Sequence, residues 1–345
     1  MQRLKKYLVL LFAICLLITH CACSQQKTDT TDTQQLSTPT PTEAAANEPE
    51  EGTNETEESS LRTDEIFDNE KYKDKFQVRF FCLDADSKAG DSMLITTPDG
   101  VNMLIDGGIK NVGSQVVNYL KQLGVEKLDY IVASHYHSDH IGGLALVINE
   151  FEVGEVMATA MPYESTLKKQ LDEAIAAKNI PVRILKAGDT FTIGNEVSAE
   201  IVNPEPEIII PEGIIPQKSD AFVNNRSIVM RVTYKNNTFL FTGDIYDERE
   251  KELVANFAEQ LDADVLKVPH HGHDTSSSGE FIEAVSPSVA VITSNAAFSV
   301  DRYKKYRAAG SDVYITGIDG NVLVVSDGEN ITAITEKDRT NSFLK

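Results

Sequence analysis

The residues best suited to chemistry lie in one short stretch, ASHYHSDHIGG, at positions 133–143. It holds His135, His137, Asp139 and His140, although the whole chain has only seven histidines. His135 and His137 are two residues apart at the end of an apolar run, so on a strand they share a face and can bind one ion. Asp139 and His140 follow after the chain turns, which suits a second ion. Such ligands favour Zn²⁺, or Mn²⁺ or Fe²⁺ where oxygen ligands dominate.

The elements that must position these residues are short strands alternating with amphipathic helices, a pattern that starts near Lys75. We predict strands at residues 76–84, 92–97, 101–106, 128–134, 263–269, 288–294, 312–316, 320–326 and 329–335, and a hairpin over 226–244 that turns at Asn236-Asn237. We predict helices at residues 114–124, 165–179, 248–261, 278–285 and 301–310. This alternation indicates two sheets packed face to face with helices outside, an α/β fold.

The spacing His135-x-His137-x-Asp139-His140 resembles the signature of the metallo-β-lactamase superfamily of binuclear metal hydrolases. Three other segments are similar to that family: MLIDGG with Asp106, FLFTGD with Asp244, and residues 264–295 with the sequence DVLKVPHHGHDTSSSGEFIEAVSPSVAVITSN. The resemblance covers about residues 76–335. It implies a single-domain αββα four-layer sandwich that binds two divalent metal ions.

The resemblance also implies a ligand set. The first ion would be held by His135, His137 and Asp244, and the second by Asp139, His140, Asp244 and one histidine of the loop after the strand 263–269. No histidine lies between His140 and His270, so the third imidazole that many relatives place on the first ion is missing. In the pair His270-His271 we place the ligand at His270, directly after Pro269, with His271 as the second choice.

Further roles follow from the same resemblance. Asp106 would contact and orient a metal ligand without binding metal itself. Asp139 would orient the attacking hydroxide as well as bind metal. His271 or His273 would touch substrate or carry a proton, although His273 is equally well explained as an exposed loop residue. Asn225 and Ser227 match an Asn-x-Ser element that could bind substrate oxygens, but they also suit a turn cap at the start of a strand. The two ions would share a bridging water, lower its pKa towards neutrality and polarise the ester.

Two branches of the superfamily are similar to this chain in the segments FCLDADSKAGDSMLITTPDGVNMLIDGG, NNRSIVM and KVPHHG. One is the extracellular hydrolase domain of the competence DNA-uptake protein ComEC, and the other comprises phosphorylcholine esterases that trim teichoic acids. Those relatives have a tight Asp-x-Gly-Gln-Gly-Asp motif, whereas here the segment from Asp84 to Asp91 is two residues longer. Any substrate contact made by that loop therefore differs.

The N-terminus predicts export. Basic residues precede an apolar core at positions 7–18, which is too short for a membrane span of ~20 residues. We expect a lipoprotein-type signal over 1–23 with Cys23 lipidated, Cys21 being the alternative, and an ordinary secretory signal remaining open. Residues 24–65 are rich in Thr, Pro and Glu and indicate a disordered tether, which leaves 66–345 as the hydrolase domain. Cys82 lies in the predicted core.

Charge bears on the substrate. The chain carries 53 acidic and 32 basic residues, a formal net charge of −21, and an acidic protein does not attract nucleic acid through its general field. We therefore expect a lipid-anchored phosphodiesterase or phosphoesterase on the outer face of the cell membrane. A cell-wall polymer is the favoured substrate, although the chain lacks the Trp that choline binding prefers. The alternatives are a ComEC-like nuclease acting on nucleic acid and a non-catalytic metal-binding lipoprotein. No protein partner is predicted.

Overall fold

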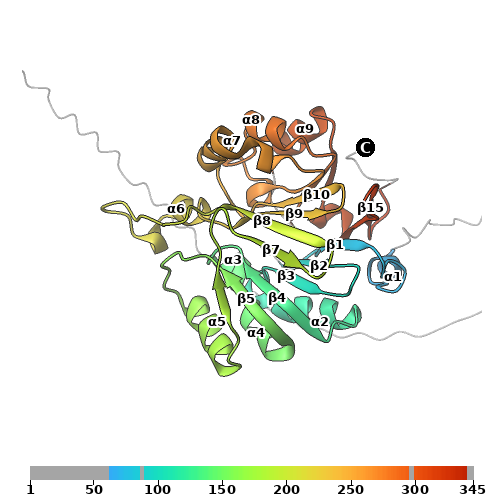
Figure 1. The fold of residues 1–345 in the computed structure, drawn as a ribbon, viewed down its shortest axis with the longest axis horizontal. Helices are drawn as coiled ribbons and strands as arrows, with labels where there is room; N and C mark the ends of the chain where they lie inside the picture. Colours follow the sequence, from blue (N-terminus) through green and yellow to red (C-terminus); the bar gives the residue numbers. More distant parts are fainter. Residues whose placement is uncertain (1–61, 86–88, 295–298, 340–345) are drawn as a thin grey trace, which may run out of the picture. The chain divides into compact units, whose positions relative to one another are not determined.

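The computed structural model describes residues 62–85, 89–294 and 299–339 (Figure 1). The predicted signal over 1–23 and most of the predicted tether over 24–65 lie outside these residues. Within the described part of the chain, no helix combines the length and the apolar composition needed to cross a membrane.

The described strands form two sheets. The eight-stranded sheet has the order β15-β14-β1-β2-β3-β4-β5-β6. Its strands are β1 (Phe76–Phe80), β2 (Met93–Thr96), β3 (Asn102–Ile105), β4 (Lys127–Ala133), β5 (Glu152–Ala158), β6 (Val182–Ile184), β14 (Val322–Ser326) and β15 (Ile331–Thr335). The seven-stranded sheet has the order β13-β12-β11-β10-β9-β8-β7. Its strands are β7 (Thr190–Ile193), β8 (Val197–Asn203), β9 (Val229–Tyr234), β10 (Asn237–Phe241), β11 (Val265–Lys267), β12 (Val289–Ile292) and β13 (Asp312–Ile315).

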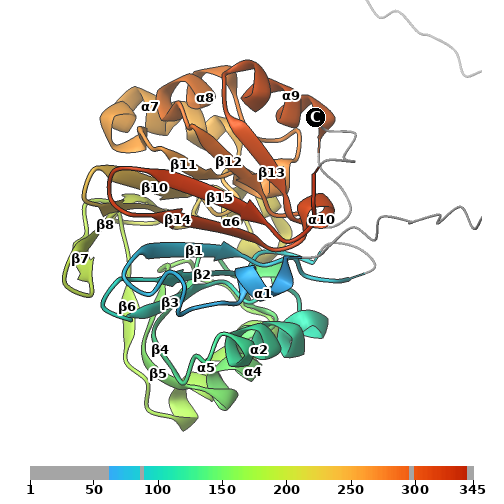
Figure 2. The ribbon, with the colours of Figure 1, turned by 90° about the vertical axis from the view of Figure 1, so that its right-hand side faces the viewer.

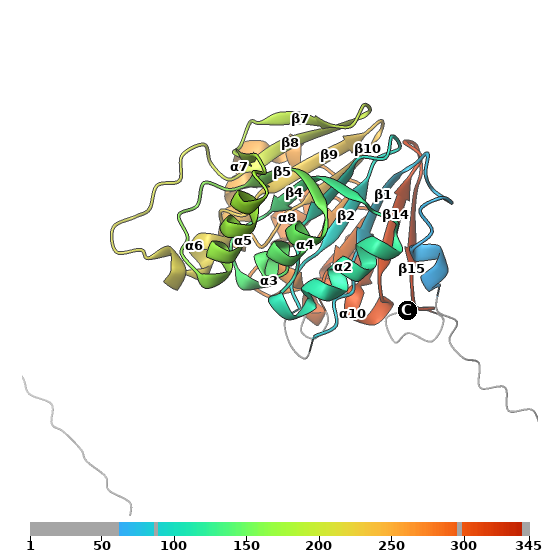
Figure 3. The same ribbon diagram turned by 90° about the horizontal axis from the view of Figure 1, so that it is seen from below.

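Helices cover the outer face of each sheet, and Figure 2 shows the resulting layers edge-on. The eight-stranded sheet carries α2 (Gly113–Gln122), α4 (Leu144–Glu150) and α5 (Thr166–Ala177), which lie side by side in Figure 3. The seven-stranded sheet carries α7 (Asp247–Leu261), α8 (Gly279–Val285) and α9 (Val300–Ala308). Shorter helices are α1 (Thr63–Ile66), α3 (Ser138–Ile141), α6 (Asp220–Asn224) and α10 (Thr316–Asp319), with single 3₁₀ turns η1 (Lys110–Val112), η2 (Pro216–Lys218) and η3 (Pro269–Gly272).

Strand β1 shows how the sequence builds these layers. Phe76, Val78 and Phe80 alternate along it and belong to the apolar cluster between the two sheets, because successive side chains of a strand point to opposite faces. The Phe76 ring lies 4.7 Å from that of Phe239 on the facing sheet. Two further apolar clusters lie beneath the helices on either side. The predicted αββα four-layer sandwich is therefore confirmed.

The structure also contains features that the sequence patterns did not predict. Strands β5 to β8, helix α4 and the short helices were not predicted. The β9–β10 hairpin turns at Lys235 and Asn236, one residue earlier than expected, because Asn237 already pairs with Tyr234. At the start of the fold, α1 begins at Thr63, inside the predicted tether, and buries Ile66 in the core.

Candidate metal centre

The candidate site lies where strands from both sheets end. The parallel strands β3 and β4 release Asp106 and the histidine stretch at one edge, and β10 and β11, also parallel, release Asp244 and the His270-His271 pair. The carboxyl ends of neighbouring parallel strands open on the same crevice, which is the usual place for a ligand in such sheets.

Four side chains come together there. Ligand atoms of Asp139, His140, Asp244 and His271 all lie within 4.8 Å of one another. Asp244 Oδ2 is 3.1 Å from His140 Nε2 and 3.2 Å from His271 Nε2, and His271 Nε2 is 3.6 Å from Asp139 Oδ2. Asp139 is partly exposed, whereas the other three are buried. Two carboxylates and two imidazoles therefore converge on one point.

Each histidine of this cluster has a buried carboxylate behind it. His140 donates its Nδ1 proton to Asp106 Oδ2 at 2.8 Å, and Asp106 also accepts from the backbone N–H and the hydroxyl of Ser134. His271 Nδ1 lies 3.0 Å from Asp91 Oδ1. Such partners fix the ring and leave Nε2 to bind metal. Asp106 thus lies where the sequence analysis placed it.

The electrostatics of the cluster reflect this crowding. Burial would lower the pKa of His140, but Asp244 and Asp106 raise it well above its ordinary value. Burial would likewise lower the pKa of His271, and Asp244 and Asp91 raise it. Burial would raise the pKa of Asp244, but His140 and His271 hold it well below its usual range. Because a metal binds the deprotonated ligand, a divalent cation would compete with protons for Nε2 of both rings.

The donor set fits a divalent metal. His271 Nε2 is buried, aims into the cluster and forms no hydrogen bond with any described residue. Both rings are already oriented by a carboxylate, and a site of oxygen and nitrogen ligands suits Zn²⁺, Mn²⁺ or Fe²⁺.

His135 and His137 lie beside this cluster. His135 Nε2 is 3.1 Å from His137 Nδ1, and the His135 ring is 4.0 Å from the His140 ring. Burial is the largest cause that lowers the pKa of both His135 and His137, so both rings stay neutral and free to bind metal at neutral pH. The structure therefore brings the predicted histidines together with Asp139 and His140 at one end of β4.

The choice between His270 and His271 is corrected by the structure in favour of the second choice. Both residues have left-handed backbone conformations, with φ of 48° and 54°, and this sharp turn directs His271 into the cluster. The His270 ring instead binds Thr275 Oγ1 through Nδ1 at 2.6 Å and stacks between Tyr246 and His273, at 4.8 and 4.9 Å. Burial is the main reason why the pKa of His270 is lowered to about 4.

Asn225 and Ser227 are not among the described residues that line the pocket, and both support the loop of Asp244. The Ser227 hydroxyl is buried and accepts the Asp244 N–H at 3.1 Å, and Asn225 Oδ1 accepts the N–H of Tyr246 at 2.8 Å. These contacts favour the alternative of a local structural role at the start of β9, and substrate binding by either residue stays a prediction.

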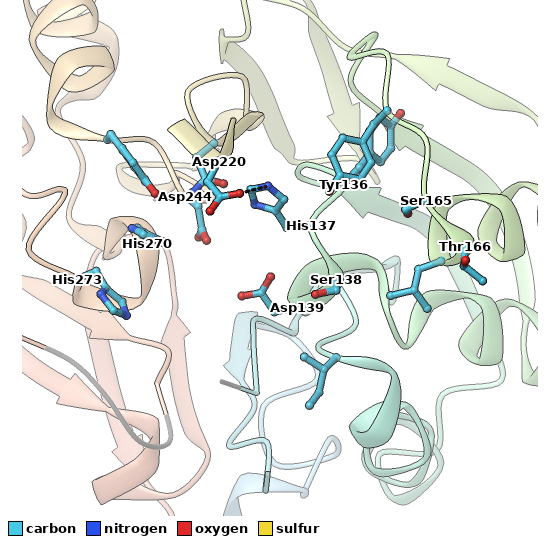
Figure 4. Close-up of a pocket in the computed structure, with 15 residues that line it drawn as sticks. Tyr136, His137, Ser138, Asp139, Ser165, Thr166, Asp220, Asp244, His270 and His273 are labelled. Atoms are coloured by element: carbon cyan, nitrogen blue, oxygen red, sulfur yellow. Dashed lines mark ion pairs between the residues drawn. The ribbon is translucent and has the colours of Figure 1, made fainter. Parts of the chain in front are cut away.

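A pocket of about 840 Å³ opens on the cluster (Figure 4). Its lining consists of aromatic, imidazole, carboxylate, small polar and two aliphatic side chains: Ile109, Tyr136, His137, Ser138, Asp139, Tyr163, Ser165, Thr166, Leu167, Asp220, Asn224, Asp244, Tyr246, His270 and His273. In Figure 4, His270 and His273 lie on one side and Tyr136, Ser165 and Thr166 on the other. His273 lines the pocket, and its contact with substrate stays a prediction.

Several residues of the site were missed by the sequence analysis. Asp91 and Lys267 form a buried ion pair beside Asp244, and Asp220 and Tyr163 line the pocket. For Lys267 a signal existed, because it lies two residues after Val265, which faces the core between the sheets, and a strand places both on one face. For Asp220 and Tyr163, which lie in α6 and in the loop before α5, no periodic pattern pointed to the site.

Comparison with known proteins agrees with this geometry. A profile of the metallo-beta-lactamase superfamily matches residues 86–293. The chain is 26% identical over 221 residues to ComE operon protein 3 of Bacillus subtilis and 27% identical over 209 residues to competence protein ComA of Neisseria gonorrhoeae. These matches cover 59% and 61% of this chain but only 27% and 26% of the two relatives, so the chain corresponds to about a quarter of each.

Among solved structures, the metallo-beta-lactamase fold protein YhfI from Bacillus subtilis matches with a TM-score of 0.45 and 15% identity, over 70% of this chain and 95% of that one. CmlA, a diiron beta-hydroxylase from Streptomyces venezuelae, matches with a TM-score of 0.41 and 12% identity, over 76% of this chain and 54% of that one. The profile match spans more than half of the chain and includes the whole histidine stretch and Asp244. The protein therefore belongs to the metallo-beta-lactamase superfamily.

Proposed function

We propose that this metallo-hydrolase is a phosphodiesterase or phosphoesterase with two divalent metal ions, held by His135, His137, Asp139, His140, Asp244 and His271. The observation that carries the proposal is the convergence of Asp139, His140, Asp244 and His271 on one point, with Asp139 and Asp244 lining an open pocket. Bound divalent ions would supply a nucleophilic water at neutral pH and polarise the ester oxygen.

The residues of the chain then have separate tasks. Asp106 and Asp91 orient the two buried imidazoles. Asp139 is the partly exposed carboxylate of the cluster and also lines the pocket, so it can orient a water as well as bind metal. His270 and His273 form a stacked pair at the pocket wall, where they can contact the leaving group.

The lining of the pocket suits a phosphoester whose second organic group is neutral or cationic. No Lys or Arg occurs among the described residues that line it, whereas Tyr136, Tyr163, Tyr246 and Asp220 do. Phosphate backbones are bound chiefly by Lys and Arg, while tyrosine rings and a carboxylate suit a neutral or cationic organic group. This favours a phosphodiester that carries a neutral or cationic head group, such as phosphorylcholine on a cell-wall polymer, over nucleic acid.

The test uses residues 24–345 loaded with Zn²⁺ or Mn²⁺. We expect about two metal ions per chain, turnover of bis(p-nitrophenyl) phosphate and p-nitrophenyl phosphorylcholine, and loss of turnover in Asp244→Asn. Asp262→Asn, a change at an exposed position after α7, serves as the matched control and should keep full activity. Metal binding without turnover of either ester would contradict the phosphoesterase assignment.

The second candidate is a nuclease, favoured by the similarity to two competence-related proteins. Single-stranded DNA should then be cut at a rate that falls steeply with salt, because each phosphate contact releases counterions. The pocket lining predicts the reverse preference, with the small phosphodiesters turned over faster and with little salt dependence. Faster cleavage of DNA would select the nuclease.

We also propose that the protein is exported and anchored to the outer face of the membrane by a lipid on Cys23, or on Cys21. The support is the sequence of residues 1–23 alone. Mass spectrometry of the N-terminal peptide from membranes tests this directly. An unmodified N-terminus in the culture medium would show an ordinary secretory signal instead.

A further inference from the structure

A lysine lies inside the candidate metal centre. Lys267, the last residue of β11, is 1% exposed. Its ammonium donates to the Gly243 carbonyl at 2.9 Å, lies 3.3 Å from Asp244 Oδ1 and contacts the Asp91 carboxylate directly. A buried ammonium is costly unless its charge is paired and its protons are hydrogen-bonded, and Lys267 meets both conditions.

The lysine connects the two parts of the centre that come from different sheets. Asp91 lies on the loop before β2 of the eight-stranded sheet, whereas β11 belongs to the seven-stranded sheet. Asp91 touches His271 Nδ1 through Oδ1, and it meets Lys267 through Oδ2. Lys267 in turn meets Asp244. The Lys267 ammonium therefore contacts both carboxylates that flank the His271 ring, Asp91 at Nδ1 and Asp244 at Nε2.

The contact with Asp244 has a geometric consequence. Lys267 takes Oδ1 of Asp244, and Oδ2 faces His140 and His271. Without the ammonium, nothing described on the Oδ1 side would hold the carboxylate in this rotamer. Asp91 would lose the ammonium that contacts its Oδ2, and the alignment of the His271 ring would weaken with it.

The local charge is a second reason to assign Lys267 a role at the metal centre. Asp91, Asp106, Asp139 and Asp244 place four carboxylates in or directly behind the cluster, and Lys267 is the one amino or guanidinium group that contacts any of them among the ion pairs of the described residues. It offsets part of the repulsion among carboxylates that must stand close together before any divalent cation is bound.

We propose that Lys267 is a positioning residue for metal binding, which holds Asp244 with Oδ2 toward the two imidazoles and, through Asp91, keeps His271 aligned. This rests on the proposed metal centre but not on any substrate. A lysine that merely fills the space between the sheets would affect stability without affecting the metal.

The test compares Lys267→Met with Arg79→Met in residues 24–345. Arg79 is the matched control, because it is another fully buried cation, on β1, whose side chain contacts the Ile66 carbonyl and no residue of the centre. Metal affinity is measured by competition with a chromophoric chelator, and the visible spectrum of the Co²⁺-loaded protein reports the ligand geometry. We expect Lys267→Met to lower metal affinity roughly 10- to 100-fold, as for other supporting partners, and to alter the Co²⁺ bands, while Arg79→Met keeps both.

A double variant covers the case in which Lys267→Met does not fold. Asp91→Asn with Lys267→Met removes both charges of the buried pair and should fold, yet still bind metal weakly. Wild-type affinity and an unchanged Co²⁺ spectrum in either Lys267 variant would overturn the proposal, as would an equal loss in Arg79→Met. Failure of the wild-type chain to bind metal would instead overturn the proposed function.

Discussion

Replacing each of the two neighbouring histidines of the η3 turn by alanine, one at a time, should separate metal binding from substrate contact. His271→Ala removes Nε2, which lies 3.2 Å from Asp244 Oδ2, and leaves Asp91 and the Thr293 carbonyl without their imidazole partner. His270→Ala removes a ring that stacks on Tyr246 and His273 at the pocket wall. The two changes are chemically identical and one residue apart, so each controls for the other.

The structure sets the expected magnitudes. Loss of a supporting partner costs metal affinity roughly 10- to 100-fold, so loss of the His271 ligand should cost at least about 100-fold, or ~2.8 kcal/mol. His270→Ala should leave metal affinity within about twofold and lose only its ring contacts, each worth ~0.5–1.5 kcal/mol. Its effect should therefore appear in the kinetics of ester hydrolysis.

The assay is competition with a chromophoric chelator at fixed pH, with elemental analysis of the purified chains and thermal unfolding of the metal-free forms to confirm folding. Weak metal binding in His270→Ala together with normal binding in His271→Ala would refute His271 as the metal ligand and support His270, the ligand expected from the sequence. Equal loss in both would show that the turn acts as a unit.

Three further outcomes are expected. Gly90→Ala should destabilise the fold by more than ~2 kcal/mol, because its Cβ would lie 1.6 Å from the Asp139 carbonyl oxygen. Gly100→Ala is the control: it is also at positive φ but has nothing within 4 Å, so it should cost only the ~1–2 kcal/mol of left-handed backbone strain. Chemical denaturation of both variants measures the difference. Burial raises the pKa of Glu250 above 4.5 although the Ser277 and Ser278 N–H groups lower it. The stability gained by protonating Glu250 is therefore fully present below about pH 4.5 and lost as pH rises through the folded-state pKa. The free energy of unfolding of wild type minus Glu250→Gln should fall over that range, and a flat or rising difference would contradict the burial argument. Chelation of the metal should lower the melting temperature reversibly, by the equivalent of ~2.7 kcal/mol relative to metal at 100 times its Kd, and an unchanged melting temperature would mean that metal does not bind the folded centre.

Much of this molecule could be predicted from local pattern. The period-2 alternation in Phe76, Val78 and Phe80 predicts a strand between two apolar layers, and the run before Ala133 predicts the strand that presents His135 and His137. Asp106 and Asp244 end strands in the same manner, so their place near the histidines follows from the meeting of strand ends. These features depend on neighbours within a few residues.

The tertiary structure decided the rest. Which of His270 and His271 turns inward depends on two successive left-handed residues, held by the Gly243 carbonyl on one side and the Thr293 carbonyl on the other. The Asp91–Lys267 pair joins two sheets through residues far apart in the chain. The core-facing position of Lys267 could be read from the strand pattern, but its partners could not, because one carboxylate comes from a neighbouring strand end and the other from the second sheet.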